Sequence, residues 1–115
     1  MAVTIYHNPR CSKSRATLAL LQERGADLKI VEYLKTPPSK AEMKKILAGL
    51  HMEPRDLMRK KEAPYKDLGL ADESLGRDAL IDAMLANPVL IERPVVVNGG
   101  KYALGRPPES VLDIL

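Results

Sequence analysis

The single cysteine of this 115-residue chain, Cys11, lies where a short strand pattern ends and a helical pattern begins. A helix N-terminus offers unpaired backbone N–H groups and the positive end of the helix dipole, and both favour a thiolate over a thiol. The usual cysteine pKa of about 8.5 falls to ~3.5–7.5 at such positions and near cations. Four basic side chains lie within four residues of the cysteine: His7, Arg10, Lys13 and Arg15. We therefore predict a reactive thiol rather than a small buried hydrophobe.

A nucleophile beside helix-terminal amides is typical of a site for an anion. A phosphatase loop needs an arginine at the sixth position after the cysteine, and that position holds Thr17. A dithiol oxidoreductase needs Cys-x-x-Cys, and its second position holds Ser14. One interpretation is that the Ser14 hydroxyl hydrogen-bonds the sulfur of Cys11 and favours its ionised form; the other is an ordinary polar residue in the first turn of a helix.

Three arginines stand beside turns or prolines: Arg59, Arg93 and Arg106. A guanidinium suits a tetrahedral oxyanion because it donates two parallel hydrogen bonds and stays charged. Taken singly, each is more often a solvated surface residue, so their importance depends on whether the fold brings them to Cys11. His7 likewise has two interpretations, a structural histidine or a group near the thiol.

Length and composition limit the possible functions. The chain has 115 residues, of which 45% are hydrophobic and 29% charged, and this predicts one folded domain. One cysteine excludes an intrachain disulfide and with it a disulfide-stapled secreted protein. A net charge of +3 and only four aromatic residues, all Tyr, argue against a nucleic-acid partner. The chain begins without a signal-peptide pattern and its apolar runs are too short to cross a bilayer, so we expect a cytoplasmic protein with no membrane partner.

The elements that must position Cys11 follow the order strand, helix, strand. Alternating residues predict a strand at 3–6, apolar spacing predicts a helix at 12–24 that Gly25 ends, and a second strand follows at 28–33. Short connections between these elements imply a right-handed crossover and two parallel strands.

The middle of the chain, residues 37–88, is mainly helical by the same criteria. Ser39 and Glu42 form a capping-box pattern for a helix that starts at Lys40. Further helical segments are predicted at 54–59, from Pro64, and at 79–85. A hairpin pattern then joins strands at 95–97 and 101–104, and a last helix runs from Pro108 to near Leu115.

Eight segments carry a more specific pattern: residues 6–15, 33–38, 57–61, 64–65, 68–70, 91–94, 106–107 and 111–115. In this order, and over essentially the whole chain, they closely resemble the glutaredoxin-coupled arsenate reductase family. The resemblance implies an α/β, thioredoxin-like fold with a mixed four-stranded sheet flanked by helices. It also implies a single domain, 1–115, whose core spans about 1–36 and 89–115 and whose helical insertion spans about 37–88 between the two halves. In such folds the proline that opens the third strand is commonly cis and faces the active thiol, which would bring Arg93 and Pro94 to Cys11.

The resemblance further implies an oxidoreductase that reduces arsenate, or a similar oxyanion, to arsenite. It assigns the nucleophile to Cys11, the oxyanion ligands to Arg59, Arg93 and Arg106, and the tuning of the thiol to His7 and Ser14. Glutathione is then the reducing co-substrate and glutaredoxin the protein partner, and no metal or bound organic cofactor is needed. The lone cysteine fits this scheme, because a chain with no resolving thiol must take electrons from external thiols.

Two other functions stay open. The pair Cys11 and Ser14 also suits a monothiol, glutaredoxin-like enzyme that removes glutathione from protein cysteines. A related regulator family of the same fold binds RNA polymerase and uses Cys-x-x-Cys as a redox switch, which Ser14 argues against. Three residues depart from the small neutral ones of the best-known reductases, and they either strengthen anion capture or alter substrate choice: Arg10, Ser12 and Lys13.

Overall fold

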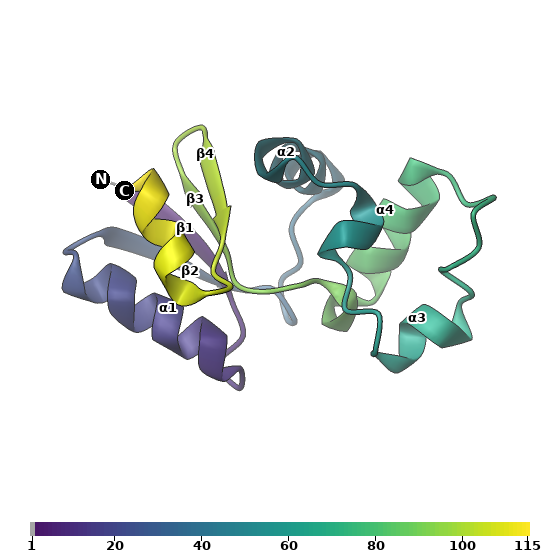
Figure 1. The fold of residues 1–115 in the computed structure, drawn as a ribbon, viewed down its shortest axis with the longest axis horizontal. Helices are drawn as coiled ribbons and strands as arrows, with labels where there is room; N and C mark the ends of the chain where they lie inside the picture. Colours follow the sequence, from purple (N-terminus) through teal and green to yellow (C-terminus); the bar gives the residue numbers. More distant parts are fainter. Residues whose placement is uncertain (1) are drawn as a thin grey trace. The chain divides into compact units, whose positions relative to one another are not determined.

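The computed structural model describes residues 2–115 and contains a four-stranded sheet with the strand order β2-β1-β3-β4 (Figure 1). The strands are β1 (Ala2–His7), β2 (Asp27–Glu32), β3 (Val95–Asn98) and β4 (Lys101–Leu104). β1 runs parallel to β2 and antiparallel to β3, and β3 pairs with β4 as a hairpin. The predicted mixed four-stranded sheet, with its parallel first pair and its hairpin, is confirmed.

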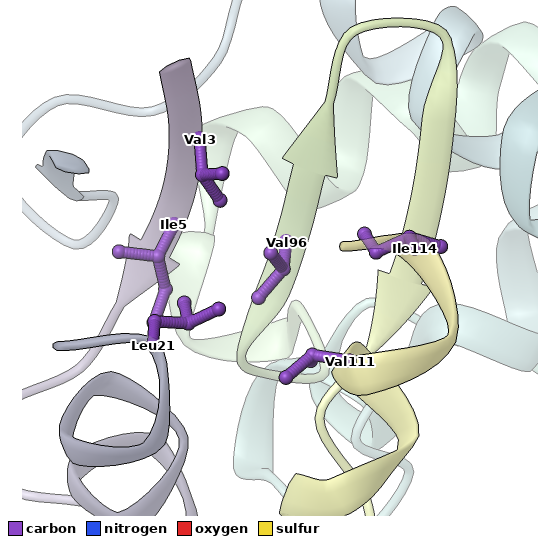
Figure 2. Packing of buried hydrophobic residues seen from close by; sticks show 6 residues of the cluster. All are labelled: Val3, Ile5, Leu21, Val96, Val111 and Ile114. Atoms are coloured by element: carbon purple, nitrogen blue, oxygen red, sulfur yellow. The ribbon is translucent and has the colours of Figure 1, made fainter. Parts of the chain in front are cut away.

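Two helices cover one face of this sheet, α1 (Ser12–Glu23) and the 3-10 helix η3 (Pro108–Ile114). Alternation along β1 turns Val3 and Ile5 to that face, and the register places Ile5 opposite Val96 of β3. Figure 2 shows these residues packed with side chains from both helices. The buried cluster comprises Val3, Ile5, Leu21, Val96, Val111 and Ile114.

The last helix differs from an ordinary α-helix, because η3 has 3-10 hydrogen bonding over seven residues. A 3-10 helix has three residues per turn, so residues three apart lie on the same side. Val111 and Ile114 have that spacing and are both buried in the cluster on the sheet. Packing of this pair holds the helix against the sheet.

The chain divides into two compact units, one formed by Met1–Thr36 with Arg93–Leu115 and the other by Pro37–Glu92. The second unit extends past the predicted end of the insertion at residue 88. The reason is a short antiparallel contact in which Met58 pairs with Ile91. On either side of it, the Arg59 N–H donates to Leu90 and the Glu92 N–H donates to Leu57, each at 2.7 Å. The single-domain organisation stays a prediction.

The second unit is helical, as expected, with α2 (Lys40–Leu50), η1 (Pro54–Leu57), α3 (Ala63–Asp67), α4 (Arg77–Ala86) and η2 (Pro88–Leu90). The predicted capping box is confirmed: Ser39 Oγ accepts from the Glu42 N–H at 3.1 Å, and Glu42 Oε1 accepts from the Ser39 N–H at 2.9 Å. The helix predicted to reach Arg59 stops at Leu57, because the next residues enter the contact with residues 90–92. Within residues 2–115, no helix combines the length and apolar character needed to cross a membrane.

Replacement of Leu21 by alanine should open a cavity between α1 and the sheet. Leu21 is fully buried, and such truncations cost about 2–5 kcal/mol. We expect a free energy of unfolding lower by that amount in a urea titration followed by circular dichroism. The matched control is Leu68→Ala, because Leu68 is 52% exposed and its loss should change stability by about 0.5 kcal/mol or less. Equal losses in the two variants would contradict the assigned core.

Candidate active site

Cys11 occupies the N-cap position of α1, with extended backbone angles of φ −95° and ψ 124°. Its N–H donates to the Asn8 carbonyl and its own carbonyl accepts from the Arg15 N–H, both at 3.0 Å. Only 9% of the residue is exposed. The side chain is thus held at the start of the helix axis, where the first backbone N–H groups have no carbonyl partner within the helix.

Asn8 organises the loop that carries the cysteine. Its Oδ1 accepts from the Arg10 N–H at 3.0 Å, and its own N–H donates to Ser14 Oγ at 3.0 Å. Arg15 closes the same loop by donating from Nη1 to the Pro9 carbonyl at 2.9 Å. An asparagine side chain that accepts from the backbone N–H two residues ahead forms an Asx-turn. Asparagine favours such turns, so Asn8 in the sequence was the signal that could have predicted this loop.

Opposing influences act on the pKa of the Cys11 thiol. Burial, the largest of them, raises it, but the backbone N–H of Ser14, the positive charge of Arg93, the backbone N–H of Lys13 and a side-chain hydrogen bond from Arg93 all lower it. The lowering influences together prevail, so the pKa lies below its ordinary value. A larger fraction of the sulfur is therefore thiolate at neutral pH, which is the nucleophilic form.

Of the three predicted arginines, Arg93 influences the thiol. Its positive charge and a hydrogen bond from its side chain both lower the pKa of Cys11. Arg106 is exposed and belongs to the same unit, in the loop after β4. Arg59 belongs to the other unit, where its Nη2 pairs with Glu62 Oε1 at 2.9 Å and its N–H donates to Leu90. The roles of all three as oxyanion ligands stay predictions. In the part of the chain from residue 2 onward, no three His, Cys, Asp or Glu side chains gather as metal ligands.

His7 and Ser14 form a buried pair beneath the loop, with 2.6 Å between His7 Nδ1 and Ser14 Oγ. The Ser14 hydroxyl therefore bonds His7 and Asn8, so the interpretation that it bonds the sulfur is wrong; Ser14 lowers the pKa of Cys11 through its backbone N–H. A hydroxyl fully buried next to a histidine is satisfied by the ring, whereas the first-turn N–H groups have no carbonyl partner within the helix.

The pKa of His7 is lowered, first by burial and further by the charge of Arg15, although Glu32 acts in the opposite direction. The neutral ring is thus favoured in the folded state. With the Asn8 N–H already donated to Oγ, the Ser14 O–H is able to donate to His7 Nδ1 when that nitrogen carries no proton.

Gly105 fixes the loop that precedes Arg106 against the cysteine-bearing helix. Its N–H donates to the Pro94 carbonyl at 2.9 Å. A Cβ at this position would lie 2.6 Å from Thr17 Oγ1 and 2.7 Å from Pro94 Cγ, closer than real Cβ contacts. The Arg93–Pro94 peptide bond is cis, as expected, and so is the Arg106–Pro107 bond.

Comparisons with known proteins agree over nearly the whole chain. The family model described as the ArsC family matches residues 6–114. The chain is 56% identical to the uncharacterized protein YfgD of Escherichia coli K12 over 98% of this chain and 96% of that one. It is 49% identical to an arsenate reductase of Rhizobium meliloti over 100% of this chain and 82% of that one. The structure of an arsenate reductase from Vibrio cholerae superposes with a TM-score of 0.96 at 52% identity, covering 100% of this chain and 98% of that one.

Substitution of Arg93 by glutamine should raise the pKa of Cys11, because it removes both a positive charge and a hydrogen bond from the sulfur. The measurement is the pH dependence of thiolate absorbance near 240 nm, or of the rate of alkylation by iodoacetamide. Arg24→Gln is the matched control, since Arg24 lies at the exposed C-terminal end of the same helix. The assignment fails if both variants titrate like the unsubstituted protein.

His7 should make the protein less stable in mild acid. The folded state keeps His7 neutral, while the unfolded chain takes up a proton near pH 6.5, so the unfolded state binds more protons and stability falls as pH falls through that value. The loss ends once the folded histidine also takes a proton. We expect His7→Gln to lose less stability between about pH 7.5 and about pH 5.5 than the unsubstituted protein. His51→Asn, at the exposed C-cap of α2, is the matched control for removal of a histidine; a pH dependence that His7→Gln does not alter would contradict the assignment.

Proposed function

This chain belongs to the ArsC family, and we propose that it reduces arsenate to arsenite at Cys11 with electrons from glutathione and glutaredoxin. The observation that carries the proposal is the lowered pKa of a thiol that Arg93 contacts at the N-terminus of α1. Relatives named arsenate reductases, 46–49% identical to this chain, support the choice of oxyanion. The thioredoxin-like fold predicted from the sequence is confirmed by the solved relatives of this family.

The first step is attack by the Cys11 thiolate on the arsenic of arsenate. A sulfur–arsenic bond forms, an arsenic–oxygen bond breaks, and the oxygen leaves as water after taking protons. Two anions must meet for this to happen, so cations at the site lower the barrier by offsetting their repulsion. Arg93 supplies one such charge at the sulfur. Arg106 and Arg59 are the proposed further ligands of the arsenate oxygens.

The second step brings in an external thiol, because the chain has no second cysteine. Glutathione replaces another oxygen on arsenic, which leaves as water, and arsenic is then bonded to two sulfurs. A glutaredoxin thiol attacks the glutathione sulfur and forms a disulfide, while the electron pair of the broken arsenic–sulfur bond stays on arsenic. Arsenic(V) becomes arsenic(III), and water releases arsenite and restores Cys11. Two thiols are oxidised for each arsenate reduced.

His7 and Ser14 act through position in this proposal. Their hydrogen bond, together with the bond from Asn8 to Ser14, fixes the first turn of α1, whose Ser14 N–H lowers the pKa of the thiol. Glutathione and glutaredoxin are kept reduced in the cytoplasm, so the proposed reaction belongs in that compartment.

The test couples arsenate reduction to NADPH oxidation through glutathione reductase, glutathione and glutaredoxin. We expect arsenate-dependent turnover that Cys11→Ser abolishes, because a serine hydroxyl is not ionised at neutral pH. Arg59→Gln and Arg106→Gln should raise the KM for arsenate by about tenfold or more, as expected for loss of a charged hydrogen bond. Arg24→Gln should leave both kcat and KM unchanged.

Two outcomes would contradict the proposal. Turnover that Cys11→Ser does not reduce would remove the cysteine from the reaction. A protein that fails to reduce arsenate but removes glutathione from a glutathionylated peptide would instead be the monothiol, glutaredoxin-like enzyme.

A further inference from the structure

A pocket of about 390 Å³ lies beside the cysteine-bearing loop, within the unit that contains the sheet. Its walls come from the end of β1 with the following loop and from the end of β2 with the following turn. The lining residues are His7, Asn8, Pro9, Arg10, Glu32, Leu34 and Lys35. Its volume falls within the range of small-molecule sites and is much larger than a tetrahedral oxyanion requires.

Three charged side chains line this pocket: Arg10, Glu32 and Lys35. Among the residues that the structure describes, the Arg10 guanidinium has no hydrogen-bond or ion-pair partner, and Arg10 is exposed. Lys35 Nζ lies 3.8 Å from Glu32 Oε1, at the far limit of an ion pair, and both side chains are largely exposed. Two cations and one carboxylate are therefore available to a ligand.

The pocket also has an apolar side. Leu34 is one of three large hydrophobic residues exposed on the described surface, with 42% of its area accessible, and Pro9 lies on the same lining. A bound inorganic anion would gain nothing from these groups and would be repelled by Glu32. A peptide with two carboxylates, one ammonium group and an apolar stem would use all of them.

We propose that this pocket binds glutathione as the thiol donor, an inference that rests on the proposed function. Arg10 and Lys35 bind the two carboxylates, Glu32 binds the ammonium group, and Leu34 with Pro9 packs against the methylene groups. Arg10 immediately precedes Cys11 in the chain, so their Cα atoms lie about 3.8 Å apart. A residue that lines the pocket is thus the direct neighbour of the nucleophile. A tripeptide anchored there presents its sulfur to the arsenic on Cys11 as the second step requires.

The first experiment measures binding without chemistry. S-methylglutathione is titrated into the Cys11→Ser protein, and backbone amide shifts are followed by NMR. We expect the largest shifts in residues 7–10 and 32–35, and a Kd raised about three- to fivefold by Lys35→Gln or Arg10→Gln and tenfold or more by both together. Lys29→Gln is the matched control, since Lys29 is an exposed lysine of β2 outside the pocket lining. Shifts confined to residues 93–106, or no shifts, would overturn the pocket assignment.

The second experiment measures the KM for glutathione in the coupled assay. Lys35→Gln should raise this KM by the same factor as the Kd and leave kcat and the KM for arsenate unchanged. With 2-mercaptoethanol as the thiol, which has no carboxylates, Lys35→Gln should have no effect. The Cys11 pKa is measured in Arg10→Gln, so that an effect on the thiol is separated from an effect on the pocket.

The two proposals fail separately. An unchanged KM for glutathione in Lys35→Gln, in a protein that does reduce arsenate, would overturn the pocket and leave the function intact. Binding of S-methylglutathione in the pocket of a protein that reduces no arsenate would support the pocket and overturn the function.

Discussion

The position of Cys11 directly before the first turn of α1, where the backbone N–H donors of Lys13 and Ser14 lower the pKa of its thiol, is the constraint on which the site depends. Burial raises the pKa of this thiol, and these donors, together with Arg93, lower it by more than burial raises it. The donors exist because α1 begins immediately after Cys11, which leaves its first N–H groups without carbonyl partners in the helix. The turn at Asn8 and the buried pair of His7 and Ser14 then hold the start of the helix in that register.

The order of the strands brings the positive charge of Arg93 to the Cys11 thiol. Antiparallel pairing places Tyr6, near the end of β1, opposite Val95 at the start of β3. Arg93, two residues before Val95, therefore lies next to the loop that follows β1 and reaches the sulfur of Cys11. Gly105 keeps the following loop close by, because any side chain there would collide with Thr17 and Pro94. The charge at the thiol is thus a consequence of sheet topology rather than of local sequence.

In the second unit, backbone pairing and an ion pair fix the position of Arg59. Residues 57–59 pair with residues 90–92, so the backbone of Arg59 is bonded to Leu90, three residues before Arg93 in the chain. An ion pair with Glu62 holds the guanidinium of Arg59 within that unit. The chain leaves the first unit after Thr36 and returns to it at Arg93, so Arg59 belongs to one unit and Arg93 to the other.

The sequence by itself determined what local chemistry decides: the strands from alternation, α2 from its capping box, the hairpin from Asn98-Gly99-Gly100, and the position of Cys11 at a helix N-terminus. These depend on neighbours in the chain, whose effects do not require the rest of the fold. Only the tertiary structure decided which arginine contacts the thiol, which partner the Ser14 hydroxyl chooses and where the second unit ends. Each of these follows from groups distant in sequence that compete for the same buried hydrogen bonds, and local propensity carries no information about that competition.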